Sequence, residues 1–134
     1  MTEAQVGLAK RALACKGWRW LPGMRTDSKF ARVVAVDSDT GVSCASEEGA
    51  TEDDCYAVWL DGVPVLPDLT DPATMGCLLA LAREAWGMPT GITVTYSSDE
   101  GLWGVSWSGA THGGCCGRGE TEGEALVAAL ESAP

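Results

Sequence analysis

Residues 66–87, LPDLTDPATMGCLLALAREAWG, contain the clearest helix signal in the chain and constrain its fold more than any other stretch. Asp71 is a favourable N-cap residue, and Pro72 suits the first helical position because an N–H there would have no partner. Apolar residues then recur at helical spacing: Met75, Leu78, Leu79, Ala82 and Trp86. Because Gly87 and Pro89 end the pattern, we expect a helix over residues 71–86 with one face against a core.

Two further helices are expected on either side of this one. Thr2 and Gln5 have the spacing of a capping box, which predicts a helix from Thr2 to about Ala14. Thr121 and Glu124 have the same spacing and predict a helix over residues 121–133. Its inward positions would be Leu126, Ala129, Leu130 and Ala133.

Strands are predicted where β-branched and aromatic residues gather, over residues 30–37, 55–60, 91–96 and 102–107. Residues 38–54 form a hairpin loop or an excursion with a short strand near Val42, and residues 109–119 are a glycine-rich return. Alternation places Ile92, Val94 and Tyr96 on one face, and Trp103, Val105 and Trp107 on one face of the next strand. The pattern predicts an α+β fold: one antiparallel sheet of four to five strands packed by two or three helices, in the order αββ…αββα.

The length of 134 residues predicts one domain over 1–134. Residues 1–65 would supply the first helix and its strands, and residues 66–134 a helix–hairpin–helix unit. No apolar run approaches the roughly 18 residues that span a bilayer, and the first residues lack the apolar block of a signal peptide. We therefore expect a cytoplasmic protein without membrane contact. Its six cysteines, which include the adjacent Cys115 and Cys116, are expected to stay reduced.

Charge is divided unequally along the chain, whose net charge is −10. Residues 1–32 hold seven basic and two acidic side chains, a net of +5, whereas the rest holds two basic and seventeen acidic, a net of −15. A basic arm of this kind either docks on the acidic body or presents a second surface to partners. The densest acidic cluster consists of Glu47, Glu48, Glu52, Asp53 and Asp54. It is a candidate surface for a basic protein partner, with a hard-cation site and a solvated loop as the alternatives.

A second candidate surface combines basic and aromatic residues at Lys16, Trp18, Arg19 and Trp20. Trp and Arg dominate binding hot spots and stack on nucleic-acid bases, which favours a contact surface. Large aromatic rings are also mostly buried, which favours a packed corner that covers the core. Both interpretations stay open at this point.

The only histidine, His112, lies near Cys115 and Cys116 and raises the question of a zinc site or a Cys–His nucleophile. Adjacent cysteines chelate poorly and no spaced C-x-x-C pair exists, so we expect no metal there. The glycines around them lack the lysine of a phosphate-binding loop, and Glu120, Glu122 and Glu124 would repel phosphate. No catalytic residue and no cofactor is expected.

The hairpin with W-x-V-x-W and the final EALVAALESA resemble the phage ABA sandwich, a small phage-encoded domain family of unknown function. RALACKGWRWLPGM and LPDLTDPATMGCLLALAREAWG also resemble uncharacterised proteins of tailed phages and prophages. The element order is similar to that of the double-stranded RNA-binding domain, but glutamates stand where that family needs lysines. The first resemblance implies a phage or prophage origin and carries no active residues.

Together these observations predict a non-enzymatic accessory protein that acts by protein–protein interaction in the cytoplasm of an infected or lysogenic bacterium. Its partner would be a host protein with a basic surface, such as a defence or nucleic-acid enzyme that it inhibits as an anti-CRISPR or DNA mimic does. The alternatives are a nucleic-acid binder that uses the basic arm, although nucleic acid is the less expected partner, and a phage structural or assembly component. A homodimer is compatible with each of them.

Overall fold

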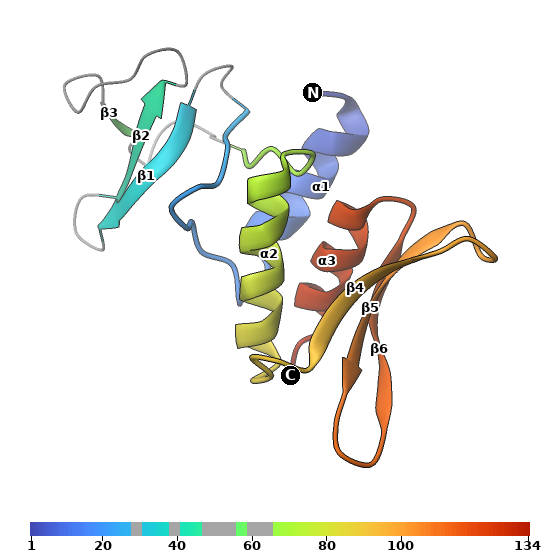
Figure 1. Ribbon diagram of the computed structural model, residues 1–134. Coiled ribbons are helices and arrows are strands. Elements are labelled where there is room, and N and C mark those ends of the chain that lie inside the picture. The colour runs from blue at the N-terminus through green and yellow to red at the C-terminus, as the bar shows by residue number, and fades with distance from the viewer. Residues whose placement is uncertain (28–30, 38–40, 47–55, 59–65) are drawn as a thin grey trace.

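The computed structural model describes residues 1–27, 31–37, 41–46, 56–58 and 66–134. In chain order its elements are α1 (Glu3–Ala14), β1 (Ala31–Asp37), β2 (Gly41–Ser46), β3 (Tyr56–Val58), α2 (Pro72–Ala85), β4 (Ile92–Ser97), β5 (Leu102–Ser108), β6 (Gly113–Gly119) and α3 (Glu122–Glu131). Figure 1 shows the three helices side by side, with β1–β3 near the first turn of α2 and β4–β6 along α2 and α3. The α+β class predicted from the sequence is confirmed.

The helix boundaries follow the capping signals of the sequence. The Thr2 and Thr121 side chains accept hydrogen bonds from the backbone of Gln5 and Glu124, whose side chains bond back, so both predicted capping boxes are confirmed. Asp71 caps α2 and accepts from the backbone N–H of Thr74. Gly87 follows the helix with φ +64°, a conformation that glycine adopts without strain.

The strands form two sheets where the sequence predicts one. Within the described residues, β1, β2 and β3 pair in that order, and β4, β5 and β6 pair in that order, all antiparallel. The expected single sheet of four to five strands is therefore corrected to two sheets of three. β5 is the central strand of the second sheet and β2 that of the first, and no strand pairing within the described residues joins the two sheets.

The strand β6 is not predicted from the sequence. Residues 113–119 are expected there to be part of a glycine-rich return, because glycine has a low strand propensity. Here its glycines allow α3 to lie close to the sheet: a Cβ at Gly117 would lie 2.2 Å from the carbonyl oxygen of Ala125, and one at Gly119 would lie 2.4 Å from Glu124 Cβ. Close helix packing therefore selects glycine in this strand.

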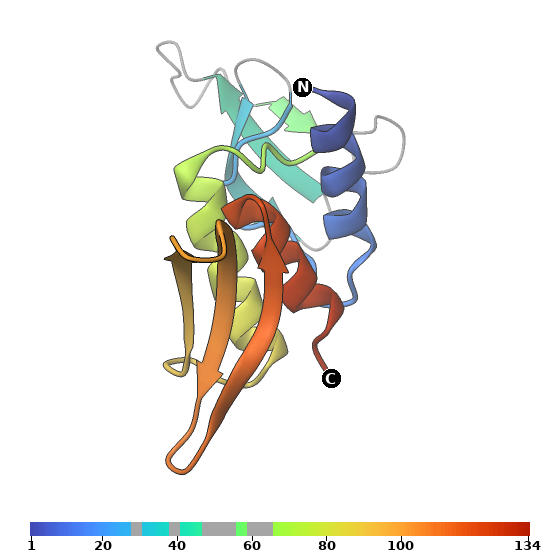
Figure 2. The ribbon, with the colours of Figure 1, turned by 90° about the vertical axis from the view of Figure 1, so that its right-hand side faces the viewer.

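The hydrophobic core lies between the helices and the inner face of the β4–β6 sheet. Its fully buried side chains include Met24, Leu78, Leu81, Ile92, Val105, Leu126 and Val127. Figure 2 shows the opposite, outer face of this sheet with α2 and α3 behind it. No described helix covers that face, and its exposed side chains include Thr93, Thr95, Ser108 and Cys115.

None of the helices in the described ranges is long and apolar enough to cross a membrane.

Candidate functional site

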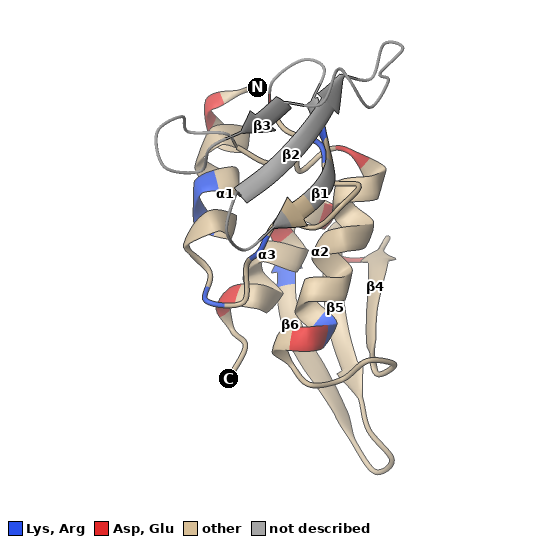
Figure 3. Ribbon diagram, turned by 90° about the vertical axis from the view of Figure 1, so that its left-hand side faces the viewer, with Lys and Arg blue, Asp and Glu red and all other residues tan. Residues whose placement is uncertain are grey.

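The basic arm, residues 1–32, is joined to the acidic body through its arginines. Arg11 pairs with Glu131 (2.7 Å) and Arg19 with Glu84 (2.5 Å), both at exposed positions. These bonds raise the pKa of each arginine and lower the pKa of Glu84 and Glu131. In Figure 3 basic and acidic positions of the described residues lie close to one another on the helices.

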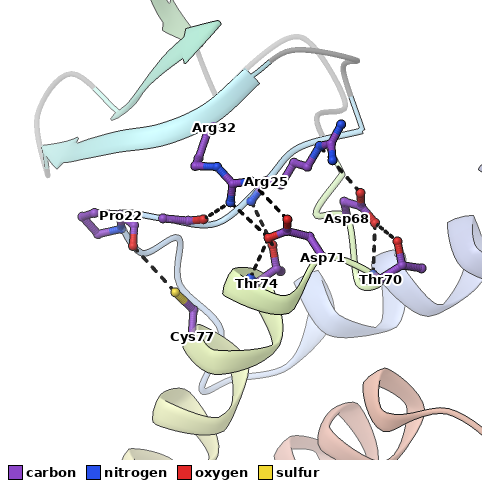
Figure 4. A network of polar contacts seen from close by, with 9 residues as sticks. Pro22, Arg25, Arg32, Asp68, Thr70, Asp71, Thr74 and Cys77 are labelled. Atoms are coloured by element: carbon purple, nitrogen blue, oxygen red, sulfur yellow. Dashed lines mark hydrogen bonds and ion pairs between the residues drawn. The ribbon is translucent and has the colours of Figure 1, made fainter. Parts of the chain in front are cut away.

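A more buried pair joins β1 to the first turn of α2 (Figure 4). Arg32 donates to both carboxylate oxygens of Asp71, each at 3.1 Å, and also to the carbonyl oxygen of Gly23. Asp71 is only 8% exposed and also accepts from the backbone N–H and the hydroxyl of Thr74. The Arg32 guanidinium is the main cause that lowers the pKa of Asp71 to about 2, and the Thr74 bonds add to it.

In this network the Asp71 carboxylate stays ionised, and both of its oxygens accept hydrogen bonds. Such a residue suits a structural role in which it joins two parts of the chain. A general base needs a pKa near neutrality and an accessible lone pair. Arg25 extends the junction, because its backbone N–H donates to the Thr74 hydroxyl (2.8 Å) and its side chain approaches Asp68 (3.9 Å). These contacts therefore attach the arm, residues 1–32, to the start of α2.

The aromatic residues of the second candidate surface pack on each other beside the core. Trp18 and Trp20 meet edge to face with ring centroids 5.6 Å apart. Trp20 is only 6% exposed, so it does not form part of an outer surface, whereas Trp18 is half-buried. The interpretation as a packed corner that covers the core therefore holds for Trp20. Of the other residues of this candidate surface, Lys16 is exposed and Arg19 forms an ion pair with Glu84.

No family model, curated protein or solved structure matches this chain. The assignment of a site therefore rests on the geometry of its own residues.

The histidine and the adjacent cysteines of the third candidate site do not converge. Cys116 is 5% exposed and its thiol donates to the carbonyl oxygen of Val105 (3.3 Å), whereas Cys115 is exposed. The two neighbouring thiols therefore lie in different environments, one at the surface and one in the core. His112 contacts Thr111 and the ring of Trp107. Among the described residues no three His, Cys, Asp or Glu side chains gather as metal ligands would.

An open groove of about 490 Å³ lies where the C-terminal ends of α1 and α3 meet, and Lys16 and the Arg11–Glu131 pair line it. Its one sulfur group is Cys15, whose thiol donates to the carbonyl oxygen of Arg11 (3.3 Å). Burial raises the pKa of this thiol, which keeps it protonated near neutral pH. A protonated thiol is a poor nucleophile.

The acidic cluster Glu47, Glu48, Glu52, Asp53 and Asp54 lies outside the described residues, and its role stays a prediction. Two other features do not follow from the sequence expectations. Asp71 is expected only as a cap, because no local pattern reveals a partner 39 positions away. Residues 91–96 are expected only as one half of a hairpin, although a strand without a single charged residue indicates an unprotected sheet edge.

Proposed function

We propose that this protein acts without catalysis, by binding a protein with a basic surface, as an accessory protein of a phage or prophage. The partner would be a host defence or nucleic-acid enzyme whose activity the bound protein blocks. The place of action would be the cytoplasm of the infected or lysogenic bacterium.

The observation that supports this proposal is that the arginines of the basic arm form ion pairs within the molecule. Four of its arginines, Arg11, Arg19, Arg25 and Arg32, are ion-paired with carboxylates of the body. Carboxylates of the same molecule therefore neutralise much of the positive charge of the arm, while the chain as a whole keeps a net charge of −10. An acidic field of this size speeds association with a basic partner and suppresses contact with nucleic acid.

The sequence supplies the surface through which the partner would bind. Between Arg32 and Arg83 there are ten acidic residues and neither lysine nor arginine, and five of the ten are Glu47, Glu48, Glu52, Asp53 and Asp54. A row of carboxylates can imitate the phosphates that a nucleic-acid enzyme recognises. The resemblance of this chain to uncharacterised proteins of tailed phages is compatible with the same role.

The test uses the full chain as bait in a bacterial lysate at low and at high salt, with mass spectrometry of the retained proteins. The key variant replaces the five clustered carboxylates by Gln and Asn, and the control variant carries Glu3→Gln and Glu120→Gln at exposed positions elsewhere. We expect a basic protein that the native chain and the control retain, that the five-site variant loses, and that high salt releases.

Two results would contradict the proposal. Retention of the same partner by the five-site variant would show that the acidic cluster is not the contact. Retention of DNA or RNA by the purified native chain at low salt would favour the basic arm as the functional surface.

A further inference from the structure

One edge of the β4–β6 sheet is open. β4 pairs with β5 along one side, and within the described residues no strand pairs with its other side, which Figure 2 shows at the margin of the sheet. Gly91 accepts a hydrogen bond from Ser108 of the β5 side (2.9 Å). Because backbone direction alternates along a strand, Ile92, Val94 and Tyr96 direct their N–H and C=O groups to the open edge.

The position of Arg83 confirms this direction independently. Its guanidinium donates from Nε (3.2 Å) and Nη2 (3.1 Å) to the carbonyl oxygen of Ile92, which must therefore point away from β5. Arg83 thus covers the edge at its first residue and leaves the backbone groups of Val94 and Tyr96 beyond it.

The two edges of this sheet differ in how well they are protected. β6 carries four glycines, Arg118 and an irregular register opposite Val105 and Ser106, which are features that discourage pairing with another strand. β4 reads Ile-Thr-Val-Thr-Tyr-Ser, without proline, glycine or charge. Its Tyr96 is one of the few large apolar side chains in the described part that stay exposed, at 55%. Such an edge favours the addition of another strand.

We propose that two copies of this chain pair antiparallel through β4 to form a continuous six-stranded sheet. The strand complements itself when Thr95 lies on the two-fold axis. Val94 then faces Tyr96 of the second copy, and Thr93 faces Ser97, twice by symmetry. The exposed Tyr96 ring gains a β-branched neighbour, which is a favourable cross-strand pair.

This register also fits the hydrogen bonds and the charges. Val94 of each copy would form two backbone hydrogen bonds with Tyr96 of the other, which makes four between the copies. The hydrogen bonds from Arg83 to the carbonyl oxygen of Ile92 would stay in place. Asp99 lies in the turn just after β4, and the antiparallel arrangement would bring it toward the start of β4 of the second copy, near the Ile92 oxygen that Arg83 holds. No ion pair of Arg83 or Asp99 occurs among the residues that the structure describes.

The charge complementarity argues for a second copy over a strand from an unrelated protein. Two chains of net charge −10 repel each other over most of their surface. The strand β4 is itself neutral, with Arg83 beside its start and Asp99 just after its end. An antiparallel second copy would bring Asp99 of each chain toward Arg83 of the other, so opposite charges would meet at both ends of the paired strands.

The first test measures the mass of the full chain by sedimentation velocity from 1 to 100 µM. We expect a dimer that dissociates at least ten-fold more readily in Tyr96→Lys, while the control Ser108→Lys, on an exposed residue away from this edge, dimerises as the native chain does. Asp99→Arg should weaken the dimer, and Asp99→Arg combined with Arg83→Glu should restore it. Far-UV circular dichroism verifies that each variant is folded.

The second test locates the axis. Cα atoms that face each other in a pair without direct hydrogen bonds lie about 4.5 Å apart, within reach of a disulfide. Thr95→Cys should therefore form a disulfide between the two introduced cysteines under mild oxidation, which peptide mapping by mass spectrometry identifies. The control Thr93→Cys, exposed on the same face of the same strand, should not, because its counterpart is four residues away across the axis.

Three results would overturn the proposal. They are a native chain that is monomeric at 100 µM, a dimer that Tyr96→Lys leaves unchanged, and equal cross-linking of the two cysteine variants. A monomeric chain that instead binds an extended peptide through β4 would assign the edge to another protein.

Discussion

Arg32 on β1 and Asp71 at the start of α2 lie 39 positions apart in the sequence and form an ion pair with two hydrogen bonds. The same carboxylate caps α2 through Thr74. One side chain thus begins a helix and fastens the arm to it.

Replacement of Arg32 by Met should destabilise the protein markedly. The Asp71 carboxylate is 8% exposed and would lose its cation. Removing one partner of a well-buried pair costs about 3–5 kcal/mol, and because Arg32 is itself 31% exposed we expect a loss of about 2–3 kcal/mol in the free energy of unfolding. Urea unfolding measures it. The control Arg11→Met, in the exposed pair with Glu131, should have a much smaller effect, and equal effects would contradict the assignment.

Stability should fall in acid in a way that depends on Asp71. Its pKa is lowered from 3.8 to about 2, so the folded state binds the proton less readily than the unfolded state. The stabilisation is fully present above about pH 5 and is lost as the pH falls through 2, with a total of about 2 kcal/mol. Urea midpoints of the native chain and of Asp71→Asn between pH 6 and pH 2 measure this. The difference between the two should shrink toward low pH, and a constant difference would show that the ion pair does not act.

The glycine positions of the β4–β6 sheet should differ sharply in their tolerance of alanine. A Cβ at Gly117 would lie 2.6 Å from the backbone nitrogen of Ala129, so α3 would have to move away from the sheet. We expect Gly117→Ala to cost about 2–4 kcal/mol, in the range of other overpacked or strained core sites. Gly104→Ala is the matched control in the neighbouring strand, since nothing lies within 4 Å of its added Cβ.

Thermal unfolding followed by circular dichroism measures both alanine variants. The melting temperature should fall by roughly 8 °C or more for Gly117→Ala and change by only a few degrees for Gly104→Ala. Similar changes in the two would show that α3 does not lie against β6.

The adjacent cysteines should react at very different rates with iodoacetamide in the folded protein. Cys115 is exposed, whereas burial raises the pKa of the Cys116 thiol and shields it. We expect Cys115 to be labelled at least ten-fold faster, as peptide mapping by mass spectrometry reports. Labelling in strong denaturant is the control and should make the two equal. Equal rates without denaturant would contradict the placement of β6.

The helices could be predicted because their signals are local. Each capping residue and the helix that it begins lie within one turn of each other, and the apolar face repeats within the same segment. Thr2, Asp71 and Thr121 each begin a helix as their patterns indicate. Tyr96 was expected on the inner face of the hairpin, and its 55% exposure arises because no described helix extends over that part of the strand.

The missed features depend on contacts between distant parts of the chain. The residues of β6 have weak strand propensity, and only the approach of α3 explains why glycine is favoured there. The partner of Asp71 is likewise invisible to local patterns, because arginine at position 32 has no sequence relation to the helix that it holds. Among the candidate sites, only the buried position of Trp20 follows from a general rule, that large aromatic residues are mostly buried.

The packing of α1 against α3 also has a consequence for synthesis. Ala9 and Ala12 of α1 are fully buried, and Arg11 is tied to Glu131, which the ribosome adds 120 residues later. The nascent chain must therefore carry its first helix uncovered for several seconds, at the usual pace of about 5–20 residues per second. Translation products that end before α3 leave the side of α1 that carries Ala9 and Ala12 exposed, which makes them substrates for chaperones and proteases.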